Sequence, residues 1–201
     1  GFQYSLDRAG RREEYNAFIR PDGTWIRQYL FPGPRPGHIQ SNSDNSLLVG
    51  EVVTKSVIRV STWLRTPMVP QFITLYSAQV LDLTAGSNPR SLSFRELFLP
   101  SAMISAFHMR PPASDPVDYD PNETMRKMEP VTVLVGSFRF DGFVRMSSQT
   151  SLESYLDVIK EAFTSIYDIQ VTPLNIPAMK PFRVPFALLR RDMVIFSARA
   201  A

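Results

Sequence analysis

The sequence predicts a mainly β protein made of two tandem small β-barrels, each with the element order β-β-α-β-β-β. The first observation is that three short segments occur twice, in the same order. One accidental match would mean little, but three in the same order indicate a duplicated domain. The matching pairs are Phe72–Val80 with Phe163–Val171, Ile58–Ser61 with Val144–Ser147, and Phe98–Ile104 with Leu188–Val194. The second observation is that β-branched and aromatic runs alternate with turn residues in both regions. Because five short, twisted strands tend to close on themselves, each copy is expected to form a small barrel.

The repeats divide the 201-residue chain into four parts. They are an N-terminal arm (1–46), a first barrel repeat (47–110), an acidic, proline-rich linker (111–130) and a second barrel repeat (131–201). Repeats of this size bury little of their surface alone. We therefore expect the two copies to pack together or to share an oligomeric interface.

The arm begins with a charged stretch and then contains a turn signal at Pro21-Asp22-Gly23. The apolar residues on either side of this turn, Phe18, Ile19, Trp25 and Ile26, predict a small hairpin. The arm either packs on the first repeat or reaches a neighbouring subunit.

The first repeat opens with two predicted strands, 47–53 and 56–60, joined by a turn at Thr54-Lys55. Ser61 is a candidate helix cap, and Pro67 ends the short helix that follows. A long strand over 71–83 comes next, then a turn over 85–89. Two closing strands, 91–99 and 102–109, are separated at Pro100-Ser101.

The linker carries five acidic and two basic residues, which indicates an extended, solvated segment. In the second repeat, Asp141-Gly142 is a favoured hairpin dipeptide and predicts the turn of the opening strand pair. The helix over 147–163 has Thr150 or Ser151 as its cap. The remaining strands are predicted over 164–174, 182–191 and 193–200.

The first repeat from Arg59 to Val80 resembles an uncharacterised bacterial family of Sm-like small β-barrels. In that family a helix of the type Arg-Leu-Ser-Asp-Phe-Leu precedes a strand of the type Phe-Ile-Pro-Leu-Thr-Asp-Ala. The matching positions are filled by Arg59, Val60, Ser61, Trp63 and Leu64 in the helix and by Phe72, Ile73, Leu75 and Ala78 in the strand. The second repeat places Leu152, Tyr155 and Leu156 in a longer helix. The resemblance implies a tandem duplication of this barrel, brings no active site, and suggests ring formation or RNA binding only by analogy of fold.

The sequence favours a protein that is not an enzyme. It has no cysteine, which removes disulfides, thiolate nucleophiles and cysteine-rich zinc sites. His38 and His108 are far apart without metal-ligand spacing, and we interpret both as polar surface residues. The carboxylates on strand patterns, where a solvent-facing charge is expected, are Glu51, Asp82, Glu96 and Asp168. No catalytic residue, cofactor or metal ligand is predicted, because no nucleophile elbow or phosphate-binding loop is present.

Six basic residues are candidate contacts for an anion or a nucleic acid. Arg59 and Arg145 take equivalent places in the two copies and either bond backbone carbonyl groups or form paired anion sites. The other four, Lys180, Arg183, Arg190 and Arg191, lie among aromatic residues in the last part of the chain. Charge mixed with aromatic side chains suits single-stranded nucleic acid.

Trp25, Tyr76 and Tyr167 are the candidate assembly contacts, since the two tyrosines occupy the same position in the repeats. The favoured function is binding or assembly through protein–protein contacts, as self-association or within a larger complex. An Sm-like nucleic-acid-binding protein and an enzyme with a site between the repeats are the alternatives. No run is long and apolar enough for a membrane span, and the absence of cysteine suits a cytoplasmic location.

Overall fold

The computed structural model describes residues 27–32, 46–52, 59–82, 90–109, 117–174 and 179–198. The strands of these segments are β1 (Arg27–Pro32), β2 (Ser46–Val52), β3 (Phe72–Asp82), β4 (Arg90–Pro100), β5 (Ile104–Met109), β6 (Arg126–Val135), β7 (Phe138–Ser147), β8 (Phe163–Pro173), β9 (Phe182–Arg190) and β10 (Ile195–Ala198). The helices are α2 (Val60–Leu64) and α3 (Leu152–Val158), with short 3₁₀ turns η1 (Ser101–Met103) and η2 (Arg191–Met193). The prediction of a mainly β protein is confirmed.

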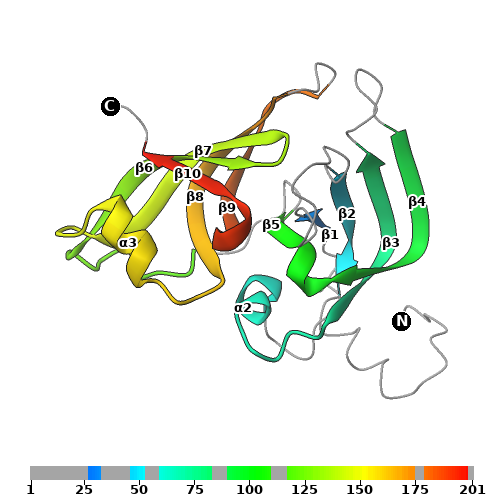
Figure 1. Ribbon diagram of the computed structural model, residues 1–201, viewed down its shortest axis with the longest axis horizontal. Coiled ribbons are helices and arrows are strands. Elements are labelled where there is room, and N and C mark those ends of the chain that lie inside the picture. Colours follow the sequence, from blue (N-terminus) through cyan, green and yellow to red (C-terminus); the bar gives the residue numbers. More distant parts are fainter. Residues whose placement is uncertain are drawn as a thin grey trace.

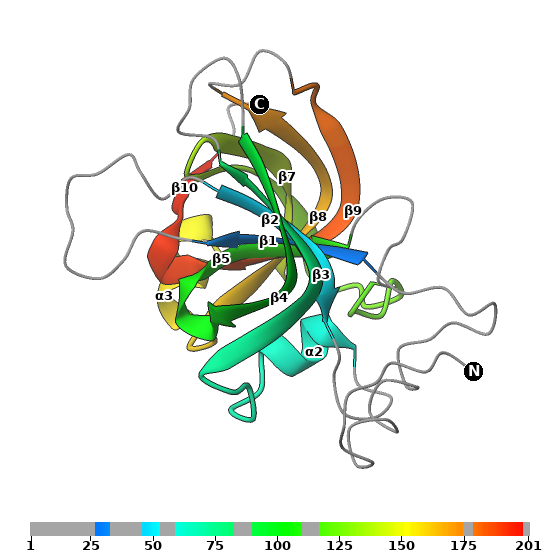
Figure 2. The same cartoon turned by 90° about the vertical axis from the view of Figure 1, so that its right-hand side faces the viewer.

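All the described strands belong to one sheet in the order β10-β6-β7-β8-β9-β5-β1-β2-β3-β4. We call β1 to β5 with α2 the first half and β6 to β10 with α3 the second half. Each half has the same strand order, since β5-β1-β2-β3-β4 corresponds to β10-β6-β7-β8-β9. The halves lie side by side, with β5 and β9 meeting in the middle (Figure 1). The sheet curls strongly when it is viewed from the first-half side (Figure 2).

The central strand pair of each half carries the same irregularity. The pairing of β2 with β3 shifts register between Val49 and Glu51, and that of β7 with β8 shifts between Asp141 and Phe143. A glycine lies at each shift, Gly50 in the first half and Gly142 in the second. Opposite the shifts, β3 and β8 each contain a residue with positive φ. These are Ser77 (φ 50°) and Asp168 (φ 49°).

Local sequence explains the start of α3 and the break between β4 and β5. Ser151 caps α3, because its Oγ accepts a hydrogen bond of 3.2 Å from the backbone N–H of Ser154. This agrees with one of the two caps predicted, although α3 ends at Val158. Pro100-Ser101 separates β4 from β5 as predicted, and η1 fills the break.

The turn predicted at Asp141-Gly142 is wrong. These residues lie inside β7, and the chain turns instead at Gly136, which has a φ of 54°. A side chain at Gly142 would collide with β8, so this glycine is required by close backbone approach rather than by a turn. The strand predicted over 56–60 also does not extend to Val60. Val60 is instead the first residue of α2, and Arg59 is the N-cap of that helix.

The boundaries between the predicted parts also differ from the structure. Strand β1 lies within the segment interpreted as the arm, and it pairs with both β2 and β5. Strand β6 begins at Arg126, within the segment interpreted as the linker. The hairpin predicted around Pro21 and the turns predicted at Thr54 and over 85–89 lie outside the described residues.

The apolar interior connects the halves. One cluster is mainly formed by the second half and also contains Leu47 and Ala106 of the first. The other is mainly formed by the first half and also contains Phe163, Phe186 and Leu188 of the second. Because side chains are shared in both directions, burial on each side depends on the presence of the other half.

Candidate functional site

The junction between the halves is a pair of antiparallel strands. β5 and β9 pair with Ala106 opposite Leu189 and Phe107 opposite Leu188. All four side chains are fully buried. The junction therefore combines strand pairing with an apolar core, as the interior of a single domain does.

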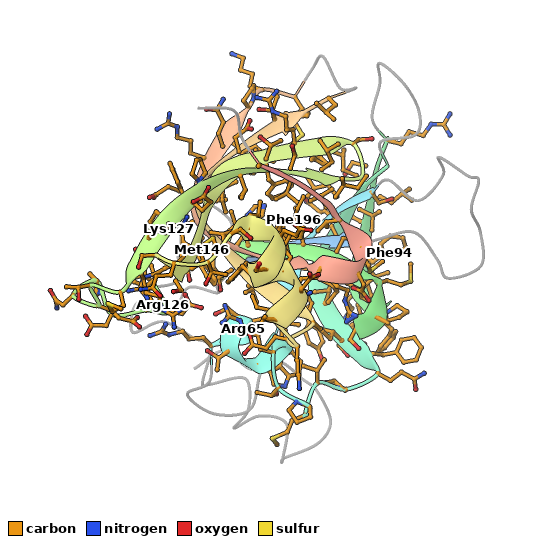
Figure 3. All side chains as sticks on the ribbon, turned by 60° about the vertical axis from the view of Figure 1, so that its left-hand side comes forward. Arg65, Phe94, Arg126, Lys127, Met146 and Phe196 are labelled. Atoms are coloured by element: carbon orange, nitrogen blue, oxygen red, sulfur yellow. The ribbon has the colours of Figure 1, made fainter. Side chains whose placement is uncertain are left out.

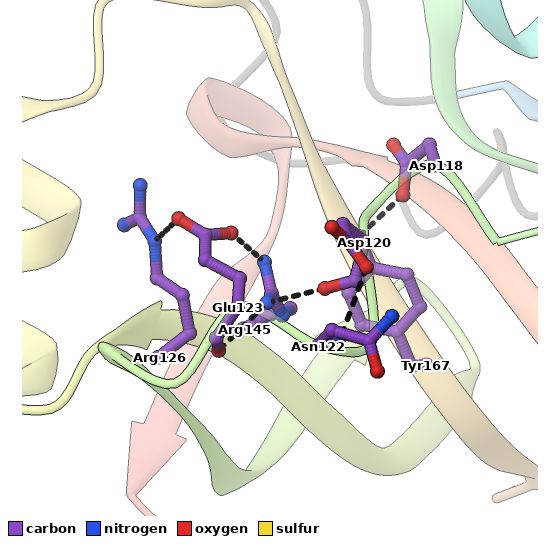
Figure 4. Close-up of polar contacts among 7 residues, drawn as sticks. All are labelled: Asp118, Asp120, Asn122, Glu123, Arg126, Arg145 and Tyr167. Atoms are coloured by element: carbon purple, nitrogen blue, oxygen red, sulfur yellow. Dashed lines mark hydrogen bonds and ion pairs between the residues drawn. The ribbon is translucent and has the colours of Figure 1, made fainter.

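A polar segment closes one side of this junction. We call residues 117–123, between the halves, the clasp. Asp118 accepts hydrogen bonds from Arg65 at the end of α2 (2.6 Å), from Ser165 Oγ (3.0 Å) and from the Tyr167 hydroxyl (2.5 Å). The last two residues lie on β8, so one carboxylate joins the first half to the second. The contact of Asp118 with Tyr167 is drawn in Figure 4, and Figure 3 labels Arg65.

The electrostatics of the clasp favour an ionised Asp118. Partial burial alone would raise the pKa of this carboxyl, but the hydrogen bond from Tyr167 and the charge of Arg65 outweigh it and hold the pKa below its ordinary value. Burial and the bond to Asp118 raise the pKa of the Tyr167 hydroxyl, which stays protonated and donates. The linker is therefore docked here, whereas the sequence indicated a solvated segment throughout.

Arg145 holds the other end of the clasp. Its guanidinium donates to Glu123 Oε2 at 2.6 Å and to the carbonyl oxygen of Asp120 at 2.9 Å (Figure 4). It also lies 4.5 Å from the ring centroid of Tyr119, in cation–π geometry. The Tyr119 ring in turn packs edge-on against Tyr167, with centroids 5.0 Å apart.

We expect Asp118→Asn to lower the free energy of unfolding by about 1–3 kcal/mol, because it weakens a charge-assisted hydrogen-bond set. Asp120→Asn is the matched control, since the Asp120 side chain accepts a hydrogen bond from the nearby Asn122 backbone N–H. Urea unfolding at neutral pH measures both variants. A carboxyl group whose pKa is lowered by folding stabilises the folded state at pH values above its unfolded pKa, and this stabilisation disappears as the pH falls. The difference in unfolding free energy between Asp118→Asn and the wild type should therefore shrink below about pH 4. Equal stability of the two variants would contradict a joining role for Asp118.

An open pocket of about 430 Å³ lies beside the clasp, between the end of α2 and the loop that enters β8. Its lining includes three basic side chains, Arg65, Lys160 and Arg190, and one acidic side chain, Glu161. The lining residues include no histidine or cysteine.

The outer strand β4 exposes apolar side chains that its counterpart buries. β4 corresponds to β9 with an offset of 90 residues, and β3 corresponds to β8 with an offset of 91. Phe98 is 61% exposed, whereas its counterpart Leu188 is fully buried. Phe72 is 50% exposed, whereas its counterpart Phe163 is 3% exposed. The difference arises because β5 and the first half cover β9, while nothing in the described chain covers β4.

Two further β4 residues are also more exposed than their counterparts in β9. Phe94 is 40% exposed, and its counterpart Val184 is buried. Leu92 is exposed, and its counterpart Phe182 is half-buried. Phe94 is labelled in Figure 3. We call Phe72, Leu92, Phe94 and Phe98 the outer apolar face. An uncovered apolar face on an edge strand is typical of an interaction site.

The opposite end of the sheet is β10, which pairs only with β6 among the described strands. β10 corresponds to β5 with an offset of 89 residues, because Phe107 pairs with Leu30 of β1 and Phe196 pairs with Val133, the corresponding residue of β6. Ile195 is 66% exposed, whereas its counterpart Ala106 is fully buried. Both ends of the sheet thus present apolar side chains at positions that are buried at the junction.

The structure gives structural partners to two of the predicted basic contacts in β9 and η2. Arg191 donates to the carbonyl oxygens of Leu156 and Ile159 at the end of α3. Arg190 lies over the Phe163 ring at 5.1 Å. Lys180 and Arg183 are exposed.

Arg59 and Arg145 do not occupy equivalent places. Arg59 is exposed at the N-cap of α2, whereas Arg145 lies within β7. The recurrence of Ile58–Ser61 therefore does not mark the same element in both halves. Tyr76 is half-buried and Tyr167 is buried at the clasp, while Trp25 lies outside the described residues.

His108 is fully buried in β5, so its interpretation as a surface residue is wrong. Its Nδ1 lies 3.0 Å from the carbonyl oxygen of Met109 and must carry the proton of that bond. Its ring packs 5.7 Å from that of Phe182. Glu51, also expected at the surface, is buried. His108 is buried because β5 lies at the junction between the halves, and Glu51 lies at the register shift between β2 and β3.

Within the described segments, no group of three or more histidine, cysteine, aspartate or glutamate side chains is arranged to hold a metal ion. Those segments also contain no helix long and apolar enough to cross a membrane. No family model, curated protein or solved structure matches the chain.

Proposed function

We propose that this protein is an assembly module that associates with further copies of itself through the outer apolar face. The observation that carries the proposal is the exposure of Phe98 at a position whose counterpart, Leu188, is fully buried. Apolar area of this kind contributes about 25 cal/mol for each Å² that contact removes from water.

We also propose that the two halves are tandem copies of one Sm-like small barrel. Three observations support a duplication: the strand order, the register shifts at Gly50 and Gly142, and the positive φ at Ser77 and Asp168. The chain would then already contain one association between copies, made by β5 with β9. An assembly function extends this association to other molecules.

Nucleic-acid binding is the alternative. It would use the exposed Lys180 and Arg183, since Arg190 and Arg191 are engaged with Phe163 and α3. The net charge of +3 gives it modest support. An enzyme with a site between the halves would use the pocket beside the clasp, whose basic lining favours an anionic substrate.

The test is solution mass by light scattering over a range of protein concentrations, at low and high salt, with absorbance at 260 nm. We expect masses above the 22.8 kDa of one chain, without nucleic acid. Phe98→Asp should return the mass to that of one chain, because a buried unpaired charge opposes association.

Met125→Asp is the matched control, because Met125 is 62% exposed and precedes β6. It should leave the mass unchanged. A wild-type protein that stays monomeric at all concentrations would overturn the proposal. Nucleic acid that co-purifies and is removed by salt would favour the alternative instead.

A further inference from the structure

We propose that the copies associate head to tail, with β10 of one molecule pairing antiparallel with β4 of the next. This inference rests on the proposed self-assembly and adds the partner strand, the direction and the register. A self-associating β4 could instead pair with β4 of a second molecule, which would give a closed symmetric dimer. The two arrangements use different strands and can be distinguished.

The junction inside the chain supplies the template. There, the last strand of the first half, β5, pairs with the fourth strand of the second half, β9. By the same correspondence, the last strand of the second half is β10 and the fourth strand of the first half is β4. Among the described strands, these two have only one neighbour each. A junction between molecules would therefore repeat the junction within each molecule.

Side-chain exposure at both ends agrees with this arrangement. Two residues of the outer apolar face, Phe72 and Phe98, correspond to Phe163 and Leu188, which lie in the apolar cluster formed mainly by the first half. At the other end, the exposed Ile195 of β10 corresponds to the buried Ala106 of β5. A pairing of β4 with β4 would leave Ile195 uncovered. The head-to-tail pairing covers both surfaces together.

The internal register predicts the external one. Phe107 lies opposite Leu188 and Ala106 opposite Leu189. Shifting Leu188 and Leu189 by the 90-residue offset, and Phe107 and Ala106 by the 89-residue offset, gives the register between molecules. It places Phe196 of one molecule opposite Phe98 of the next, and Ile195 opposite Leu99. Directly opposed residues have Cβ atoms about 4.5–5.5 Å apart, which is close to the range that a disulfide can bridge.

A mixing experiment tests the direction. Phe98→Asp leaves β10 free and blocks β4, whereas Ile195→Asp leaves β4 free and blocks β10. We expect each variant alone to be monomeric and an equimolar mixture to form a 1:1 dimer that grows no further. Dimers of the Ile195→Asp variant alone would overturn the head-to-tail pairing, because β4 would then have paired with β4.

Cross-linking tests the register. The chain has no cysteine, so introduced cysteines can react only with each other. We expect Phe98→Cys mixed with Phe196→Cys to form a disulfide-linked dimer on mild oxidation. Phe94→Cys mixed with Phe196→Cys is the control, because four residues along a strand displace the thiols by about 13 Å. A cross-link in the control and none in the predicted pair would overturn the register.

The outcomes separate the two proposals. If the wild-type protein is monomeric, self-assembly itself fails. If it is oligomeric but the mixture of the two Asp variants stays monomeric, self-assembly holds and the head-to-tail pairing fails. A wild-type protein that forms either a series of oligomers of increasing size or a closed ring supports the inference, since both arise from a repeated head-to-tail contact.

Discussion

Gly142→Ala is expected to lower the free energy of unfolding by about 3 kcal/mol, the upper part of the range for added volume in a packed interior. A Cβ at this position would lie 2.7 Å from the backbone carbonyl oxygen of Tyr167 and 2.9 Å from Ile166 Cγ2. The nearest atom belongs to the backbone of a central strand and cannot rotate away. β7 and β8 would have to separate where Tyr167 bonds Asp118, so the substitution should loosen the clasp as well.

Gly50→Ala is the matched control, because Gly50 lies at the corresponding register shift of the first half. Its added Cβ would meet Leu75 Cβ at 3.1 Å and the Tyr76 carbonyl oxygen at 3.3 Å, which a small shift relieves. We expect it to cost about 1 kcal/mol or less, since alanine also restricts the unfolded chain. Urea unfolding at matched protein concentration measures both variants. Equal losses would show that close approach to β8 does not explain Gly142.

Much of the secondary structure could be predicted because it depends on local sequence. Phe72–Val80 and Phe163–Val171 recur, and they form β3 and β8 with the same register to their neighbours. Pro100 ends β4 just before η1, as its counterpart Arg190 ends β9 just before η2. These signals arise from residue types and spacing, which remain readable without the rest of the fold.

The features that matter most for the proposed function depend on contacts far along the chain. The alternation of β4 predicts a strand but gives no sign that it lies at the end of the sheet. Asp118 was missed because a single acidic residue in a proline-rich segment gives no sign of a partner 47 residues away in Ser165. The turn prediction at Asp141-Gly142 was wrong for the same reason, since the close approach of β8 to Gly142 cannot be read from the local sequence.

His108 should make stability depend on pH between about 6.5 and 4. Burial lowers the pKa of its imidazole from 6.5 to about 4, and the bond to the Met109 carbonyl opposes this shift only in part. Between these values the unfolded chain binds a proton that the folded chain does not. Stability therefore falls with decreasing pH, by roughly 3 kcal/mol across the interval.

His108→Leu should flatten this part of the stability curve, whatever its effect at neutral pH. The comparison is made by urea unfolding at several pH values in a His38→Gln background, so that no other histidine titrates. His108 lies on β5, beside the residues that pair with β9, so a protonated imidazole would place a charge in the buried environment next to the junction. A wild-type curve that stays flat from pH 6.5 to 4 would show that His108 is hydrated in solution, and that the junction is more open than its buried side chains indicate.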